Sequence, residues 1–243
     1  MLVLASASPR RRELLTQAGF TFTVHPAHIP EDPHPNEDPI AYVTRLARQK
    51  AEAVFRELTV NGIPEPALKG HDFSRANNDP KEVGALAPEG SISDKSNKQG
   101  APGPDSRTWE TTNPNPAPGG SLVVLGADTT VTLDNHILGK PDSPADAARM
   151  LRLLSGRTHH VITGVALVTA QTTQVAAEVT AVRFLTLSDQ DIAAYIATGE
   201  PMDKAGAYAI QGYAARWIPR IEGCYFNVVG LPIALVTTLL EFL

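Results

Sequence analysis

The chain has 243 residues, a net charge of −5 at pH 7 and one cysteine. This length can bury a hydrophobic core in one large domain or two small ones. The acidic balance, with a pI near 5.8, argues against nucleic acid as the main partner, because a general duplex-binding protein normally carries a basic face. One cysteine excludes a disulfide framework within the chain, so we expect a reducing, cytoplasmic location.

Neither end of the sequence has the features of a targeting or membrane segment. The apolar run at residues 2–5 is too short for a signal sequence, and arginines follow it instead of preceding it. The apolar stretch at 231–243 is too short to span a bilayer and is interrupted by polar residues. We therefore expect no membrane partner and interpret this stretch as a core helix with Pro232 in its first turn.

The first sixty residues predict strands alternating with helices. Residues 2–5 predict a short buried strand, and residues 20–24 predict a second one. Between them, Ser8 and Pro9 are typical of the N-cap and first turn of a helix. A long helix is expected to open at Asp38, because apolar residues then recur at helical spacing. These residues are Ile40, Val43, Leu46, Ala47, Val54 and Leu58.

The composition changes abruptly near Glu57 and returns near Ser121. The intervening segment is rich in Pro, Gly, Ser, Asn and Asp, contains GAPGPDS and NPNPAPGG, and has two aromatic residues. Such a segment cannot bury enough apolar surface to offset its loss of conformational entropy. We interpret residues 59–119 as a disordered insertion in a single α/β domain that spans residues 1–243.

The second half of the sequence continues the alternation. Strands are expected at 122–125, 161–169, 175–184 and 207–210. The first of these is a continuous apolar run, which is typical of a central strand. Ser143, which precedes Pro144, and Ser188 are typical N-caps of two further helices. The whole pattern predicts an α/β fold in which helices flank a mixed, twisted sheet.

The first motif with a chemical meaning is SASPRRRELL, which starts at Ser6. A strand that passes through a serine-rich turn into a helix start offers free N–H groups and the positive end of the helix dipole to an anion. Arg10, Arg11 and Arg12 add positive charge, and a guanidinium group can bind two phosphate oxygens at once. The alternative interpretation is an ordinary capped helix with solvated arginines.

Two further charged residues stand in apolar surroundings. Lys50 lies on the apolar stripe of its helix, where a lysine either extends to solvent or meets an anion. Asp128, in GADTTV, follows the apolar run at 122–125, and open α/β sheets bind their ligands at the ends of such strands. Asp128 is therefore a candidate Mg²⁺ ligand or water-orienting residue, or else a turn residue that caps the strand.

The remaining motifs are weaker when taken singly. Lys140 lies in the loop GKPDSP before a predicted helix, and SGRTHHVITGV follows that helix. His159 and His160 are adjacent, so in a strand they point to opposite faces, and we expect no zinc site. Gln211 ends the motif MDKAGAYAIQG, and its amide carries both a donor and an acceptor, which suits the edge of a nucleotide base.

Together these motifs resemble those of the Maf family, also called septum-formation inhibitor homologues. The matching segments, in the order of the family, are LASASPRRRELL, RLARQKAEAV, VVLGADTTV, GKP, SGRTHHVITGV, DKAGAYAIQG and NVVGLP. The resemblance covers the chain except for the predicted insertion. The IQG form of the base-side motif is similar to the subgroup that acts on dTTP and UTP, and differs from the subgroup that acts on 7-methyl-GTP.

The resemblance implies an inosine-triphosphatase-like fold with a central cleft, and a nucleoside triphosphate pyrophosphatase that uses a divalent cation, Mg²⁺ or Mn²⁺. The implied catalytic residues are Asp128, Lys50, Lys140, Arg10 and Gln211, and the implied substrate contacts are Ser6, Ser8, Arg11 and Lys204. Asp128 and Glu31 are the implied metal ligands. The sequence HIPED around Glu31 is less acidic than is usual in the family, which weakens that assignment.

Two other functional classes are alternatives to a pyrophosphatase. A nucleotide-binding regulator of cell division or septum formation would need the cleft, but it would need no water-activating carboxylate such as Asp128. A dinucleotide-dependent oxidoreductase is excluded, because no G-x-G-x-x-G motif follows a strand. We expect a nucleoside triphosphate as the partner and no nucleic acid, and the sequence leaves a monomer and a homodimer open.

Overall fold

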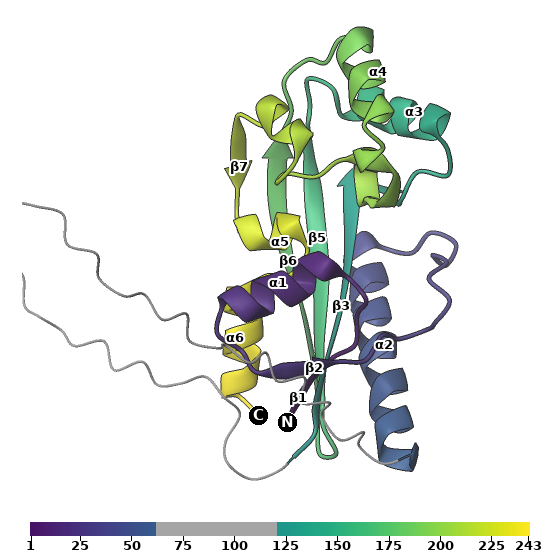
Figure 1. Cartoon of the computed structure of the whole chain (residues 1–243). Coiled ribbons are helices and arrows are strands. Elements are labelled where there is room, and N and C mark those ends of the chain that lie inside the picture. The colour runs from purple at the N-terminus through teal and green to yellow at the C-terminus, as the bar shows by residue number, and fades with distance from the viewer. Residues whose placement is uncertain (62–120) are drawn as a thin grey trace, which may run out of the picture. The chain divides into compact units, whose positions relative to one another are not determined.

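A seven-stranded mixed sheet organises the part of the chain that the computed structural model describes, residues 1–61 and 121–243 (Figure 1). The strands are β1 (Leu2–Leu4), β2 (Phe22–Val24), β3 (Val123–Leu133), β4 (His136–Leu138), β5 (Thr158–Val168), β6 (Thr173–Arg183) and β7 (Arg220–Glu222). Their order is β2-β1-β3-β5-β6-β7, and β4 pairs with β3. Strand β1 is parallel to β2 and β3, and the other pairs are antiparallel, so the predicted mixed sheet is confirmed.

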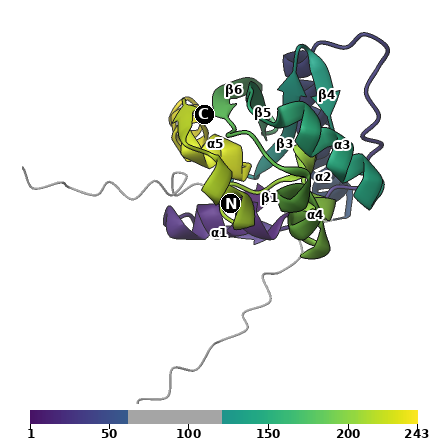
Figure 2. The same cartoon turned by 90° about the horizontal axis from the view of Figure 1, so that it is seen from above.

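Helices cover both faces of this sheet. They are α1 (Pro9–Gln17), α2 (Pro39–Asn61), α3 (Pro144–Leu154), α4 (Asp189–Ala197), α5 (Tyr225–Val229) and α6 (Ile233–Glu241), with short 3₁₀ helices η1 (Glu200–Asp203), η2 (Ala205–Ala207) and η3 (Tyr213–Trp217). Helix α2 packs on one face, and α1, α5 and α6 pack on the other (Figures 1 and 2). Helices α3 and α4 enclose a third core at one end of the long strands. None of the helices within residues 1–61 and 121–243 is long and apolar enough to cross a membrane.

Three helices begin at the serines that the sequence predicts as N-caps. The hydroxyl oxygens of Ser8, Ser143 and Ser188 each accept a hydrogen bond from the backbone N–H three residues later. Each such cap typically contributes about 1 kcal/mol to stability. The C-terminal helix α6 begins directly after Pro232, which is its N-cap, and buries Val236 against the sheet.

Two strand predictions are wrong, and both errors concern the site. Strand β3 does not end near residue 125 but runs through Leu133, so Asp128 lies inside a strand and not beyond its end. The turn-forming residues Gly126 and Asp128 are held in the extended conformation because β3 pairs with β5 along almost its whole length. The strand expected at 207–210 is absent, because positive φ angles at Gly206 and Ala207 turn the chain there.

Two smaller differences between the prediction and the structure concern α2. The helical spacing predicts Ile40 on the apolar stripe, but Ile40 lies in the first turn of the helix and is 45% exposed. The helix also runs to Asn61, so the first three residues of the predicted insertion, 59–61, are helical. The rest of that predicted insertion lies outside the described residues.

Helix α2 approaches the sheet closely at two glycines. A Cβ atom at Gly126 in β3, or at Gly164 in β5, would collide with the backbone of α2. The missing side chains therefore allow the helix to lie directly on these strands. Asp128 follows Gly126 by two residues and points to the same face of β3. The close approach thus brings Lys50, on α2, to the level of Asp128.

We expect Gly164→Ala to lower the free energy of unfolding by about 1–3 kcal/mol, because the new methyl group presses on the α2 backbone and overpacking typically costs this much. Chemical denaturation followed by circular dichroism measures the change. Gly139→Ala is the matched control, since nothing lies within 4 Å of a Cβ at that position. Equal stability of the two variants would show that the contact between α2 and β5 tolerates a side chain.

Candidate active site

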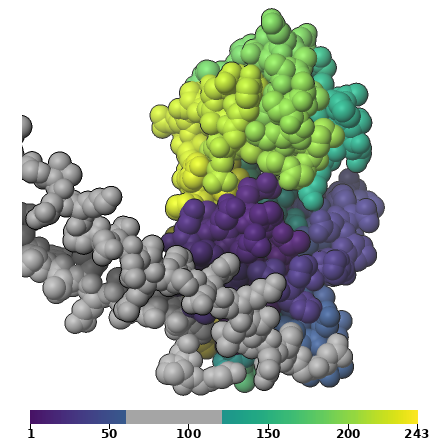
Figure 3. Space-filling model, viewed as in Figure 1, coloured from purple at the N-terminus to yellow at the C-terminus, as the bar shows by residue number. Residues whose placement is uncertain are grey.

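A cavity of about 560 Å³ opens between the N-terminal turn, α2 and the segment that follows α4. This volume is in the usual range for small-molecule sites. In the space-filling view, the purple segment with α1 borders the green segment after α4, and the cavity lies between them (Figure 3). Every residue selected from the sequence lines it. These residues are Ser6, Ser8, Arg10, Arg11, Glu31, Lys50, Asp128, Lys140, Lys204 and Gln211.

The ammonium group of Lys50 lies between two carboxylates. Its Nζ is 2.7 Å from Oδ1 of Asp128 and 2.7 Å from Oε1 of Glu31. Lys50 and Asp128 are each 7% exposed, whereas the Glu31 side chain is half exposed. Lys50 therefore meets anions and does not extend to solvent, which decides between the two alternatives left open by the sequence.

The two carboxylates have pKa values shifted in opposite directions. Burial raises the pKa of Asp128 above its ordinary value, and the nearby charges of Lys50 and Arg11 offset only part of that effect. For Glu31, burial also acts to raise the pKa, but the hydrogen bond and charge of Lys50, together with Lys140, lower it overall. Glu31 is thus firmly ionised, while Asp128 is the stronger proton acceptor of the two.

Arg11 makes most of the hydrogen bonds that hold the serine-rich turn in place. Its Nε donates to the carbonyl of Gly230 (2.8 Å), and its Nη1 donates to the carbonyl of Ala127 (2.9 Å) and to Oγ of Ser6 (3.1 Å). Its Nη2 donates to Oγ1 of Thr129 (3.0 Å). Four of the five guanidinium N–H groups thus bind protein acceptors. Arg11 ties the serine turn to β3, and among the described residues one of its N–H groups has no acceptor, which leaves it for the predicted substrate contact.

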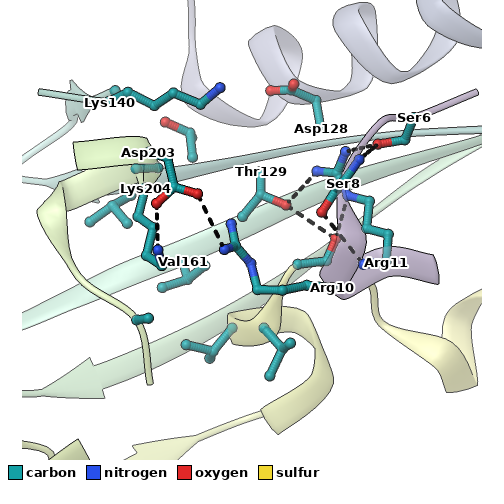
Figure 4. Close-up of a pocket in the computed structure, with 18 of the residues that line it drawn as sticks. Ser6, Ser8, Arg10, Arg11, Asp128, Thr129, Lys140, Val161, Asp203 and Lys204 are labelled. Atoms are coloured by element: carbon teal, nitrogen blue, oxygen red, sulfur yellow. Dashed lines mark hydrogen bonds and ion pairs between the residues drawn. The ribbon is translucent and has the colours of Figure 1, made fainter. Parts of the chain in front are cut away.

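Arg10, Lys140 and Lys204 are the other cations that line the cavity. Arg10 lies 3.8 Å from Asp203, across the cavity from Lys140 and Asp128 (Figure 4). Lys204 also pairs with Asp203, and it donates to the backbone carbonyl of Glu200 at 2.9 Å. Five cationic side chains line the cavity, against three carboxylates, although the whole chain has a net charge of −5. This local excess of positive charge favours an anionic ligand.

A match across the whole sequence agrees with this geometry. The model of the family described as Maf-like protein matches residues 1–243. The chain belongs to the Maf family. It is 44% identical over 235 residues to a protein of Koribacter versatilis named dTTP/UTP pyrophosphatase, covering 97% of this chain and 90% of the relative.

Other Maf relatives carry the same name. A dTTP/UTP pyrophosphatase of Moorella thermoacetica is 42% identical over 241 residues, which is 98% of this chain and 93% of the relative. One of Salmonella typhimurium is 41% identical over 232 residues, which is 96% of this chain and 87% of the relative. The resemblance inferred from the motifs is thereby confirmed.

Three further residues complete the Maf cavity and were not selected from the sequence. Tyr42, on α2, donates its hydroxyl to the backbone carbonyl of Glu31 at 2.9 Å and holds the loop that carries this carboxylate. Burial and the nearby carboxylates raise its pKa to about 12, so it stays a donor. Asp203 and Thr129 adjoin selected residues in the DKAG and GADTTV motifs. The sequence signal for Asp203 and Thr129 was their position next to Lys204 and Asp128. The signal for Tyr42 was its position two helical turns before Lys50.

The two adjacent histidines have separate surroundings, as the sequence predicts. His160 is exposed, whereas His159 is fully buried, and its Nε2 lies 2.7 Å from the hydroxyl of Tyr208. Burial lowers the pKa of His159 to about 3, so it is neutral at physiological pH. Its edge-on contacts with Phe184 and Tyr208 give it a packing role behind the Maf cavity.

Two carboxylates of the cavity, Asp128 and Glu31, are the candidate ligands for a divalent metal. No group of three or more His, Cys, Asp or Glu side chains positioned to hold a metal occurs in residues 1–61 and 121–243. Asp128 and Glu31 nevertheless lie close together, since one oxygen of each is 2.7 Å from Lys50 Nζ, and the ammonium group occupies the space between these two oxygens. Mg²⁺ is commonly bound by one or two carboxylates together with substrate phosphates. The second oxygen of each carboxylate, which does not contact Lys50 in these ion pairs, is the one that could bind a cation held jointly with a triphosphate.

We expect Lys50→Met to raise the pKa of Asp128 further, because the substitution removes the largest influence that lowers it and leaves burial and Glu31, which both raise it. Titration of the carboxyl ¹³C signal by NMR measures the shift. Lys140→Met is the matched control, since it removes a cation whose charge lowers the pKa of Glu31. An unchanged titration of Asp128 in Lys50→Met would contradict the charge coupling inferred from the 2.7 Å contact.

Proposed function

We propose that this chain is a nucleoside triphosphate pyrophosphatase that hydrolyses dTTP and UTP to the monophosphate and pyrophosphate. The observation that carries the proposal is the buried Asp128 carboxylate in a cavity with an excess of cations. Relatives at 38–44% identity named dTTP/UTP pyrophosphatase support the substrate class. A pocket that only bound nucleotide would gain nothing from the buried carboxylate of Asp128, because its negative charge repels the phosphates.

The reaction needs positioning and charge more than covalent chemistry. Water attacks the α-phosphorus, the bond from that phosphorus to the bridging oxygen breaks, and pyrophosphate leaves with the electron pair while a proton is released. The serine turn and the N-terminal end of α1 offer N–H groups to phosphate oxygens. Arg10, Lys50 and Lys140 are the side chains that we propose compensate the negative charge on the leaving group.

Asp128 is the proposed essential carboxylate. Its raised pKa suits it to accept a proton from the attacking water, and its position beside Glu31 suits it to hold a cation. A Mg²⁺ or Mn²⁺ ion bound by Asp128 and Glu31 would neutralise phosphate charge and lower the pKa of bound water. Both roles depend on the negative charge of Asp128. Tyr42 keeps Glu31 near this point through its backbone.

We expect Asp128→Asn to fold normally, because the side chains are nearly the same size and Glu31 still compensates the charge of Lys50. We expect it to lose at least about a hundredfold in kcat, the usual cost of removing one such electrostatic contact. Release of pyrophosphate from dTTP and UTP with Mg²⁺ measures the activity. Asp134→Asn is the matched control, because that carboxylate pairs with Arg157 on the surface.

Two outcomes would count against the assignment. Near-normal turnover by Asp128→Asn would remove Asp128 from the catalytic group. If the wild-type protein bound triphosphates but released no pyrophosphate from any of them, it would be a nucleotide-binding regulator and not a hydrolase.

Gln211 is the proposed base-reading residue. Uracil and thymine present an acceptor at O4 beside the N3–H donor, and an amide can pair with both. Cytosine reverses that pattern, so a site fitted to uracil leaves polar groups unpaired, at a cost of roughly 1–3 kcal/mol per group. We expect kcat/KM for dTTP and UTP to exceed that for CTP at least about tenfold, and Gln211→Ala to narrow this difference. A wild-type preference for CTP or a methylated purine would overturn the base assignment but not the reaction.

A further inference from the structure

The segment that carries Gln211 is anchored at both ends by two side chains from outside it. The backbone N–H of Ala209 donates to the hydroxyl oxygen of Tyr195 at 3.2 Å. The backbone N–H of Tyr213 donates to Oε2 of Glu200, also at 3.2 Å. The Tyr195 hydroxyl in turn donates to Oε1 of Glu200 at 2.8 Å. These three hydrogen bonds form one connected series, which links the residues on either side of Gln211.

The packing around these three hydrogen bonds leaves little room for the residues that form them to move. A Cβ atom at Gly212 would collide with the Glu200 carboxylate, so the carboxylate lies directly against the backbone next to Gln211. Tyr195 is fully buried, and its ring stacks on Tyr213 with centroids 5.5 Å apart and an interplanar angle of 15°. The hydroxyl of Tyr195 therefore has a fixed position from which to hold the segment.

These two residues lie behind the cavity and not in its lining. The lining includes Ala209, Ile210 and Gln211, whereas Tyr195 comes from the buried face of α4 and Glu200 from the start of η1. Any influence of this pair on a bound nucleotide must therefore pass through the backbone of residues 209–213. The phosphate-side residues Asp128 and Lys50 belong to β3 and α2, which the chain of bonds does not touch.

We propose that Tyr195 and Glu200 are positioning residues for base selectivity, an inference that rests on the proposed function. A glutamine on a mobile segment can move and turn its amide to suit either uracil or cytosine. On a fixed backbone, fewer amide positions are available, and the neighbouring backbone groups can hold one orientation. Selectivity then depends on the anchors as well as on Gln211 itself.

The decisive measurement is the ratio of kcat/KM for dTTP to that for CTP. Tyr195→Phe keeps the buried ring but removes the hydroxyl that bonds both Ala209 and Glu200. We expect the ratio to fall about three- to tenfold, the equivalent of one lost hydrogen bond. The fall should come mainly from a higher KM for dTTP, with little change in kcat. Glu200→Gln should act in the same direction, since one amide oxygen cannot replace two carboxylate acceptors.

Tyr213→Phe is the matched control, because its hydroxyl bonds Arg216 on the surface and its backbone N–H is retained. This substitution removes one hydroxyl from the same stacked pair of rings, and we expect the ratio of kcat/KM for dTTP to that for CTP to equal the wild-type value. A variant that was only destabilised would lose activity on dTTP and CTP in proportion, leaving the ratio unchanged. An unchanged ratio in folded Tyr195→Phe and Glu200→Gln would overturn the inference.

Hydrogen exchange separates this inference from the proposed function. The amides of Ala209 and Tyr213 should exchange faster in Tyr195→Phe than in the wild type or in Tyr213→Phe, whatever the enzyme hydrolyses. If the wild type releases no pyrophosphate from dTTP or UTP, the proposed function fails, and the selectivity role fails with it even where the exchange result shows the anchor. If the wild type is active and the exchange rates and the ratio both stay constant, only the positioning role fails.

Discussion

The buried ammonium group of Lys50, held between Asp128 and Glu31, is the contact around which the site is arranged. Removing a charge from water is costly unless an opposite charge compensates for it, so neither Lys50 nor Asp128 would be stable in this position alone. The pairing therefore requires α2 to lie directly on β3. Gly126 makes that possible, because any side chain there would collide with the helix backbone.

The cations that line the cavity have different roles. Arg11 is surrounded by protein acceptors and fixes the serine turn to β3, whereas Arg10 and Lys140 lie at the open space of the cavity. A site that must bind a triphosphate benefits from this arrangement, because its donors are already in place when the ligand arrives. The Tyr195–Glu200 pair would extend the same principle from the phosphates to the base.

Much of the site was predictable from the sequence because its parts are short local motifs. The N-cap Ser8, the lysine on an apolar stripe at Lys50 and the Asp128 motif each carry their own signal, and their order along the chain identifies the family. The local setting of Asp128 was predicted wrongly, since turn-forming residues usually end a strand. Pairing with β5 overrides that preference, because it satisfies the backbone on that side as far as Thr132.

The sequence by itself determined the starts of α1, α2, α3 and α4, the mixed α/β pattern and the residue types that gather in the cavity. Capping, hydrophobic periodicity and motif spacing are local properties of the chain. Tertiary structure alone decided which of these residues face each other. Tyr42 reaches the backbone of Glu31, and Tyr195 reaches that of Ala209, through contacts between separate elements. No local pattern encodes such contacts, since they depend on how closely helices and strands pack once the core has formed.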